Sequence, residues 1–318
     1  MIESKFVAAV VQAAPHYLNL EASVAKAIEL IRDAAASNAR LIAFPELWLP
    51  GYPWWVWLGP EEWAESCGFN SRYRREAFDF SGAHAQRLKE AARKYGIAVA
   101  MGVAEEADDT LYISQWLIGD NGDTLWQRRK LKPGFVERNL FADGGAGNLN
   151  VAETPLGRVG GLCCSEHRHP LFKYALYEQH EEIHIAAWPS FQANQPQRPG
   201  IGPEINNALS RIYAAEGGCY VLAPCALVTG EMIDLVCDTP ERKALLQKGG
   251  GFACAFGPHG NALGTPLNEH EEGLMLVTID PEQIRAAKIA YDVVGHSARP
   301  DVARLEMAST REGGSQHG

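Results

Sequence analysis

Three residues far apart in the sequence, Glu46, Lys130 and Cys164, have the side-chain types that cysteine-based catalysis requires. A free thiol with a pKa near ~8.5 is only a few per cent thiolate at neutral pH. It becomes a useful nucleophile when a base removes its proton and a positive group stabilises the charge that develops. A carboxylate and an ammonium supply these two functions. The three residues therefore predict a nucleophilic site, provided that the fold brings them together.

Each of these residues also has an ordinary structural interpretation. A cysteine is most often a small buried apolar residue. Glu46 could cap a helix, and Lys130 could belong to the solvated face of the basic run 128–130. Cys163 is expected to face the core if Cys164 faces a pocket, because neighbouring strand residues point to opposite sides. The structural interpretation is the expected one for Cys67, Cys219, Cys225, Cys237 and Cys254.

The hydrophobic pattern places the three reactive side chains at or just after strand ends. An apolar run at 6–14 predicts a strand, helical spacing predicts a helix at 20–36, and a buried strand at 41–44 stops just before Glu46. Ligand sites in α/β folds form at such strand ends. Further helices are predicted at about 82–95, 170–180 and 204–216, and further strands at 97–103, 111–118, 124–130, 159–164, 183–188, 219–222, 252–256 and 274–279.

The second half of the chain repeats the alternation of the first half. No linker rich in Pro or Ser separates the two halves. We therefore expect one α/β domain over residues 1–305, built from two related layers. Residues 306–318 are expected to form a disordered tail.

Four segments give the chain a resemblance to a known family. They are FPELWLPGYP with WWVWLG at 44–59, RKLKP with VER within 129–138, GGLCCSEH at 160–167 and GHSARPDV at 295–302. In these segments and in their order, the chain resembles the nitrile-hydrolysing branch of the nitrilase family over nearly its whole length. The family pattern makes the first lysine of RKLKP the catalytic one, with Lys132 as the competing choice, and the second cysteine of GGLCCSEH the nucleophile.

This resemblance implies an α-β-β-α four-layer sandwich of the nitrilase superfamily, with a two-fold pseudo-repeat. It also implies hydrolysis of a small organic nitrile to a carboxylic acid and ammonia, through a thioimidate and then a thioester on Cys164. Glu46 would be the base, Lys130 would stabilise developing charge, and Glu137 would be a supporting carboxylate. No cofactor or metal is implied, and the expected assembly is a homodimer or a larger homo-oligomer. The implied pocket is lined by Tyr52, Trp57, Ser165, His167 and Trp188.

The chain departs from the family pattern at Ser165, where an indole usually follows the nucleophile. A hydroxymethyl group in this place should open volume and remove a rigid wall. The substrate preference of typical members therefore does not transfer to this chain. If the tetrahedral intermediate expels thiolate instead of ammonia, the product is an amide, and Ser165 makes that outcome credible.

Other interpretations stay open at this stage. The chain could be an amidase, a carbamoylase or a cyanide hydrolase, although the tryptophan-rich run and the Arg-Pro-Asp segment favour the nitrile branch. A non-catalytic assembly protein on the same scaffold is a further alternative, and Trp54 and Trp55 could form an exposed interaction surface. Thiolates and imidazoles also suit zinc, but two adjacent cysteines do not easily share one tetrahedral ion. The residues of that alternative are Cys163, Cys164, His167 and His169.

The charge, the cysteine spacing and the lack of long apolar runs limit which partners and which cell compartment are expected. A net charge of −10 and a pI near 5.5 offer no basic surface to nucleic acid or to anionic lipid. Seven cysteines without regular spacing do not indicate a disulfide framework. The sequence contains neither a signal-like start nor an apolar run near the roughly 20 residues of a membrane span. We expect a cytoplasmic enzyme whose partners are a small nitrile and water.

Overall fold

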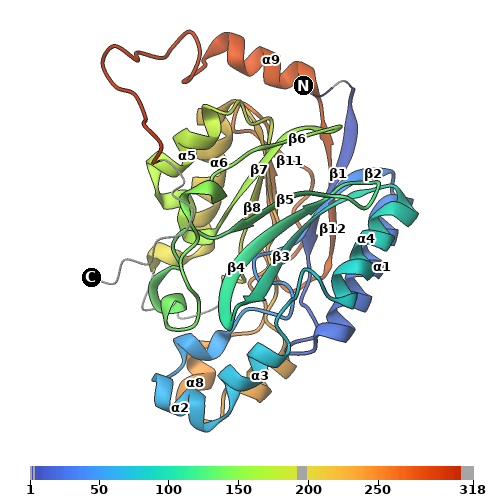
Figure 1. Cartoon of the computed structure of the whole chain (residues 1–318), viewed down its shortest axis with the longest axis vertical. Helices are drawn as coiled ribbons and strands as arrows, with labels where there is room; N and C mark the ends of the chain where they lie inside the picture. The colour runs from blue at the N-terminus through green and yellow to red at the C-terminus, as the bar shows by residue number, and fades with distance from the viewer. Residues whose placement is uncertain (1, 3, 192–198, 309–318) are drawn as a thin grey trace.

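Two six-stranded sheets pack against each other in the computed structural model, which describes residues 2, 4–191 and 199–308 (Figure 1). The strand order is β12-β1-β2-β3-β4-β5 in the first sheet and β11-β10-β9-β8-β7-β6 in the second. In both sheets three central strands run parallel, β1-β2-β3 and β7-β8-β9, and antiparallel strands complete the edges. The strands are β1 Phe6–Gln12, β2 Ala39–Ala43, β3 Ala98–Ala107, β4 Thr110–Ile118, β5 Thr124–Arg129, β6 Ala152–Thr154, β7 Gly157–Cys163, β8 Ile183–Ala187, β9 Tyr220–Ala223, β10 Cys254–Phe256, β11 Ala262–Leu263 and β12 Gly273–Ile279.

The central strands are apolar on both faces because each face is covered. Along β1, Ala8 and Val10 belong to the core between the sheets, whereas Ala9 and Val11 pack with the helices on the outer face. This is the two-residue alternation of an extended chain. A strand buried on both sides reads as a continuous apolar run, which is why the sequence could predict β1 but not which face meets which layer.

Helices α1 and α4 cover the outer face of the first sheet, and α5 and α6 lie on the outer face of the second (Figure 1). The Asn19 side chain accepts the N–H of Ala22 and begins α1, and Gly96 in the left-handed region ends α4. The expected α-β-β-α class is confirmed. The helices are α1 Leu20–Ala36, α2 Glu61–Ser66, α3 Phe69–Arg75, α4 Ala83–Tyr95, α5 Pro170–Tyr177, α6 Pro203–Gly217, α7 Gly230–Val236, α8 Pro240–Leu245 and α9 Pro281–Ala290.

Most element boundaries lie within two residues of the predicted ones. The ends of β3 and of α5 lie further away, since α5 ends at Tyr177 and not near residue 180. Strand β3 continues to Ala107 because its whole length pairs with β4. The strand predicted at 159–164 ends at Cys163, since Cys164 has a φ of +43° and begins the short 3₁₀ helix η4, Cys164–Arg168. The sequence pattern did not predict the short helices α2, α3, α7, α8 or the longer α9.

The expectation of a single domain over residues 1–305 stays a prediction. Of the expected tail, residues 309–318 lie outside the described residues, and 306–308 form neither helix nor strand. None of the described helices combines the length and apolar character needed to cross a membrane.

Candidate active site

Three strands deliver the reactive side chains to one place. Glu46 follows β2, Lys130 follows β5 and Cys164 follows β7. The Lys130 ammonium lies 2.8 Å from Oε1 of Glu46 and 2.7 Å from Oε2 of Glu137. A carboxylate oxygen of Glu46, one of Glu137 and the sulfur of Cys164 all lie within 4.8 Å of one another. The structure thus brings the three sequence candidates and Glu137 together into one cluster, called the reactive cluster below, in which Cys164 alone is partly exposed.

Lys130 is fully buried, and its charge is held by two carboxylates. Burial disfavours the ammonium, but Glu137 and Glu46 outweigh it and raise the pKa of Lys130 well above its usual value. Lys130 is therefore a permanent cation at neutral pH. Lys132, the competing choice, is half-exposed and pairs with Asp143 at the surface.

Glu46 is the least satisfied member of the reactive cluster. Its Oε1 accepts from Lys130, whereas its buried Oε2 has no hydrogen-bond partner among the described residues. Burial raises the pKa of this carboxyl to about 8, with Lys130 opposing the shift. The loop that carries Glu46 crosses β3 at Gly102, where a Cβ would lie 2.0 Å from the carbonyl oxygen of Pro45. Only glycine permits that close crossing.

Glu137 is fixed from three sides. Its Oε2 accepts from Lys130 and from the backbone N–H of Gly134 at 2.6 Å, and its Oε1 accepts the Tyr52 hydroxyl at 2.8 Å. The Trp57 indole N–H donates to the same hydroxyl at 3.0 Å. Both lone-pair sites of Oε2 are occupied and Oε1 already accepts one hydrogen bond, so Glu137 is held in a position that orients Lys130.

Cys164 stands at a sharp turn at the strand end. A φ of +43° is uncommon for a residue with a side chain, and such backbone strain is found mostly at functional sites. Burial raises the pKa of the Cys164 thiol well above its usual value, so the thiol is protonated when no substrate is bound. A thiol in this state needs a base in order to act as a nucleophile, and Oε2 of Glu46 is a nearby acceptor without a partner among the described residues.

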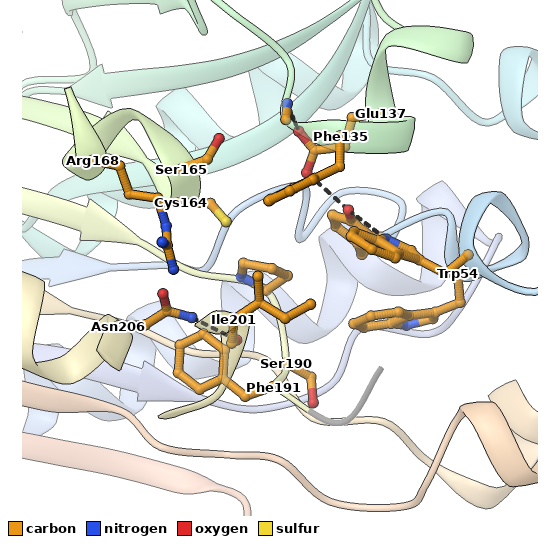
Figure 2. A pocket seen from close by; sticks show the side chains of 14 residues that line it. Trp54, Phe135, Glu137, Cys164, Ser165, Arg168, Ser190, Phe191, Ile201 and Asn206 are labelled. Carbon is orange, nitrogen blue, oxygen red and sulfur yellow. Dashed lines mark hydrogen bonds between the residues drawn. The ribbon is translucent and has the colours of Figure 1, made fainter. Parts of the chain in front are cut away.

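A cavity that is open to solvent lies in front of Cys164 (Figure 2), and the empty space in it and at its mouth is about 540 Å³. Three of the residues predicted to line a substrate pocket, Tyr52, Trp57 and Ser165, do lie on its wall. Sequence reasoning did not place the other lining residues. Trp54 and Arg168 lie in the segments that follow Glu46 and Cys164, whereas most of the rest come from separate loops and from the start of α6. Those lining residues are Trp54, Gly134, Phe135, Arg168, Pro189, Ser190, Phe191, Ile201 and Asn206.

The other two predicted pocket residues, His167 and Trp188, lie behind the cavity. Both are buried, and their rings stack at 4.9 Å between centroids. Neither belongs to the lining among the described residues. The carbonyl oxygen of Trp188 accepts the backbone N–H of Glu46 at 3.4 Å, so Trp188 holds Glu46 through its backbone.

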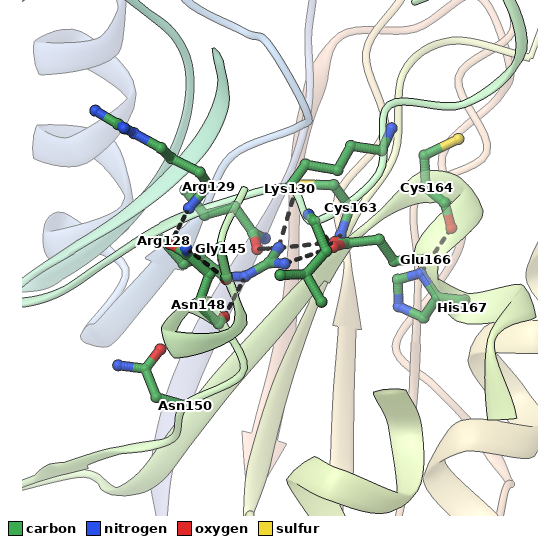
Figure 3. Close-up of polar contacts among 12 residues, drawn as sticks. Arg128, Arg129, Lys130, Gly145, Asn148, Asn150, Cys163, Cys164, Glu166 and His167 are labelled. Carbon is green, nitrogen blue, oxygen red and sulfur yellow. Dashed lines mark hydrogen bonds and ion pairs between the residues drawn. The ribbon is translucent and has the colours of Figure 1, made fainter. Parts of the chain in front are cut away.

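A second buried ion pair lies beside the reactive cluster (Figure 3). Arg128 donates two hydrogen bonds to Glu166, at 2.6 and 2.8 Å, and both side chains are inaccessible to solvent. Sequence reasoning missed this pair. The signal was available, because Arg128 is two residues before Lys130 in the strand predicted at 124–130, and alternate residues of a strand face the same way.

Two interpretations from the sequence are wrong. The basic run 128–130 is not a solvated face, because Arg128 and Lys130 are buried at 2% and 0% exposure. Trp54 and Trp55 are not an exposed interaction surface either. Trp54 lines the cavity, and Trp55 is buried against Phe69.

The described residues do not support the zinc site considered from the sequence. The set of ligand-type atoms that comes together is that of Glu46, Glu137 and Cys164, and not that of the neighbouring cysteines and histidines. Cys163 turns away from the cavity toward Arg128, at 3.8 Å. Both carboxylates of the reactive cluster already bind the Lys130 ammonium, which supplies the positive charge that a metal ion would bring.

Sequence comparison gives close relatives over most of the chain. A family model described as carbon-nitrogen hydrolase matches residues 7–289. A nitrilase of Pseudomonas syringae is 50% identical over 297 residues, covering 93% of this chain and 88% of the relative. An arylacetone-specific nitrilase of Alcaligenes faecalis is 45% identical, with 94% and 84% covered, and an aliphatic nitrilase of Rhodococcus rhodochrous is 40% identical, with 95% and 82% covered.

Solved structures with the same fold are more distant in sequence. The NitFhit protein of C. elegans has a TM-score of 0.73 at 20% identity, covering 99% of this chain and 71% of that one. Saccharomyces cerevisiae Nit3 has a TM-score of 0.70 at 17% identity, with 93% and 97% covered. An amidase from Nesterenkonia has a TM-score of 0.64 at 18% identity, with 90% and 95% covered. These likenesses concern the fold alone.

Proposed function

Because this chain belongs to the carbon–nitrogen hydrolase family, we propose that it is a nitrilase that hydrolyses a small organic nitrile to a carboxylic acid and ammonia. The nitrilase names of relatives at 40–50% identity support the reaction class. The observation that carries the proposal is the buried Glu46 carboxyl. It binds Lys130 through Oε1, its Oε2 has no partner among the described residues, and one of its oxygens lies within 4.8 Å of the Cys164 sulfur.

In the first stage Glu46 takes the proton of the Cys164 thiol as the sulfur attacks the nitrile carbon. One π bond of the nitrile opens, and its electron pair moves to nitrogen. Lys130 stabilises that charge, and the proton held by Glu46 is delivered to the nitrogen. The product of this stage is a thioimidate on Cys164, with every proton accounted for.

In the second stage a water molecule gives a proton to Glu46 and adds to the thioimidate carbon. The resulting tetrahedral species, once protonated on nitrogen, breaks its C–N bond and releases ammonia. A second water hydrolyses the remaining thioester, which releases the acid and returns the proton to the sulfur. If the C–S bond breaks first instead, the product is an amide, so the ratio of acid to amide reports which bond breaks.

The cavity gives the proposed substrate an aromatic surround. Tyr52, Trp57 and Ser165 are the lining residues that the sequence and the geometry share, and Glu137 would keep Lys130 oriented. Ser165 leaves space beside the nucleophile, where a substituent on the reacting carbon could lie.

We further propose a cytoplasmic homodimer or larger homo-oligomer. The acidic charge, the irregular cysteine spacing and the family membership support this assignment. Light scattering on the purified protein and fractionation of the source cells test the two parts separately.

A panel of aliphatic, aromatic and arylacetic nitriles, with ammonia, acid and amide measured together, tests the reaction. We expect ammonia and acid from at least one class, and loss of both in Cys164→Ala. The matched control is Cys163→Ala, which should keep most of the activity. Retained turnover in Cys164→Ala would overturn the assignment of the nucleophile, and hydrolysis of amides alone would overturn the reaction.

A further inference from the structure

Behind the nucleophile, a line of buried polar groups runs from the backbone of Cys164 toward α6. The carbonyl oxygen of Cys164 lies 2.9 Å from Nδ1 of His167, whose Nε2 lies 3.0 Å from Nε2 of His184. Nδ1 of His184 lies 2.9 Å from Oε1 of Glu181, and the Tyr213 hydroxyl donates to Oε2 of Glu181 at 2.5 Å. Each of these four side chains is at most 1% exposed.

Three contacts link the Cys164 carbonyl to His167, His167 to His184, and His184 to Glu181. Each contact needs one hydrogen, so together they fix the number of protons in this line. A carbonyl only accepts, so Nδ1 of His167 carries a hydrogen. One hydrogen must lie between the two Nε2 atoms, and one between His184 and Glu181. That makes three hydrogens, whereas two neutral imidazoles supply two. The third is an acid proton, which can rest on Glu181, His184 or His167 without breaking a hydrogen bond. If it leaves, two lone pairs face each other at one of the contacts.

We propose that Glu181, His184 and His167 form one hydrogen-bonded chain that shares a single acid proton and anchors the carbonyl of Cys164, which keeps the thiol in its attacking position. The inference rests on the proposed role of Cys164 as the nucleophile. His167, Glu181 and His184 are positioning residues, because they act through the Cys164 backbone and do not line the cavity.

Cys164 needs such an anchor because its backbone is strained. Its φ of +43° persists only where the surroundings hold it. Glu166 accepts the N–H of Cys163 at 2.7 Å on one side of the turn, and His167 donates to the Cys164 carbonyl on the other. The peptide unit that follows the Cys164 α-carbon is thus held by His167, and the peptide unit that precedes the Cys163 α-carbon is held by Glu166.

The surroundings favour an uncharged chain, with the acid proton on Glu181. Burial raises the pKa of Glu181 to about 8 and lowers the pKa of both His167 and His184 well below the usual value. A buried neutral acid next to neutral imidazoles avoids the cost of an isolated charge. The titratable and charged groups that face the chain are Tyr177, Tyr213, Cys219 and Lys288 around Glu181, and Arg128, Glu166 and Lys173 around the imidazoles.

His167 variants test the anchor. In His167→Asn, the side-chain amide can take the place of Nδ1 and donate to the Cys164 carbonyl, whereas His167→Leu removes the donor. We expect His167→Leu to lower kcat about 10- to 100-fold with little change in KM, and His167→Asn to restore most of it. The exposed His259→Leu is the matched control and should have no effect. A fully active His167→Leu would overturn the proposal.

Glu181 variants test the shared proton. The amide of Glu181→Gln can donate to His184 and accept from Tyr213, whereas Glu181→Met can do neither. We expect the kcat of Glu181→Gln to lie within about threefold of the wild-type value, and the kcat of Glu181→Met to fall about tenfold or more. If Glu181→Gln is folded and as inactive as Glu181→Met, the chain needs a charge, and the neutral arrangement is wrong.

The pH dependence of stability in the wild-type protein and in Glu181→Gln gives a second test of the shared proton. A native pKa of about 8 against a usual 4.5 means that unfolding releases a proton between these pH values. The contribution of Glu181 to the free energy of unfolding is therefore full below pH 4.5 and is lost as the pH rises to about 8. Glu181→Gln should remove this part of the fall in Tm with rising pH. If Tm falls with pH as steeply in Glu181→Gln as in the wild-type protein, Glu181 is not a buried neutral acid.

Failure of the anchor can be told apart from failure of the nitrilase proposal. The rate at which iodoacetamide alkylates Cys164, measured by peptide mapping against the exposed Cys67, needs no substrate. We expect His167→Leu to change that ratio several-fold and His167→Asn to leave it near the wild-type value. Equal ratios in all three proteins would overturn the anchor, whether or not the protein hydrolyses nitriles.

Discussion

Arg128 and Lys130 lie two residues apart, point to the same side of the first sheet, and are both buried against glutamates. Their glutamates differ. Each carboxylate oxygen of Glu166 accepts two hydrogen bonds: Oε1 from Arg128 and the N–H of Leu131, and Oε2 from Arg128 and the N–H of Cys163. Both oxygens are therefore fully used. Glu46 binds Lys130 through Oε1 and leaves Oε2 without a partner in the described part of the chain. We call Arg128–Glu166, whose acceptors are all used, the closed pair, and Lys130–Glu46, which keeps an unused acceptor, the open pair.

The difference separates a structural role from a chemical one. Although burial opposes it, Arg128 holds the pKa of Glu166 below its usual value, so Glu166 stays a carboxylate and keeps its geometry. For Glu46, burial outweighs Lys130 and raises the pKa of the carboxyl into the range where a proton can be taken and returned. An unused buried acceptor beside a cavity therefore indicates chemistry, and a saturated buried pair indicates support.

The largest expected effect comes from removing the open acceptor. Glu46→Gln keeps the shape and one contact to Lys130 but cannot take the thiol proton. We expect a fall in kcat of about 10³-fold or more, with the free energy of unfolding lowered by less than about 1 kcal/mol. Steady-state kinetics and urea unfolding measure the two quantities. Near-normal kcat would mean that Glu46 is not the base.

Breaking the closed pair should reverse that pattern. Arg128→Met leaves Glu166 charged and unpaired in the core, which typically costs about 3–5 kcal/mol of stability. We expect a large fall in the urea midpoint and a loss of activity that follows the loss of folded protein. The neighbouring Arg129→Met is the matched control, because the Arg129 side chain is 34% exposed and should contribute about 1 kcal/mol or less. Equal losses in both variants would contradict the comparison.

The pH dependence of the rate should report the open pair alone. Since burial raises the pKa of Glu46, the base form is gained only as the pH rises through the neutral range. We expect kcat/KM to increase from pH 6 to about 8. Arg129→Met should keep this limb. A rate already constant from pH 5 upward would place the essential base outside the reactive cluster.

The smallest expected effect concerns the support of Glu137. Tyr52→Phe removes one hydrogen bond to that carboxylate and leaves those from Lys130 and Gly134. We expect kcat to fall by about three- to tenfold, corresponding to a neutral-donor hydrogen bond of roughly 1 kcal/mol. Thermal unfolding controls for the fold. A loss as large as that of Glu46→Gln would show that Tyr52 acts on the substrate directly.

The sequence predicted the reactive cluster better than its surroundings, and the reason is physical. Glu46, Lys130 and Cys164 stand at strand ends within distinctive segments, so type, place and context agreed. Glu181 and His184 gave no such signal, because their roles depend on β8 lying beside β7 and on Tyr213 from α6. Contacts made across a sheet or between layers do not show in local patterns.

The same limit applies to the cavity. Tyr52 and Trp57 lie in the segment that carries Glu46, and Ser165 adjoins Cys164, so their placement followed from their neighbours. Phe135 and Phe191 come from separate loops, and only the packed fold places them on one wall. His167 was expected on that wall too, but the turn at Cys164 directs its ring into the core.

The most direct test of the account is to trap the covalent intermediate. A nitrile substrate is mixed with the enzyme and quenched in acid, and the adduct is located by peptide mass spectrometry. We expect an acyl or imidoyl adduct in the peptide that contains Cys164, and we expect it to be kept in Cys163→Ala and absent in Cys164→Ala. An adduct that survives Cys164→Ala, or turnover without any adduct in the wild-type protein, would contradict it.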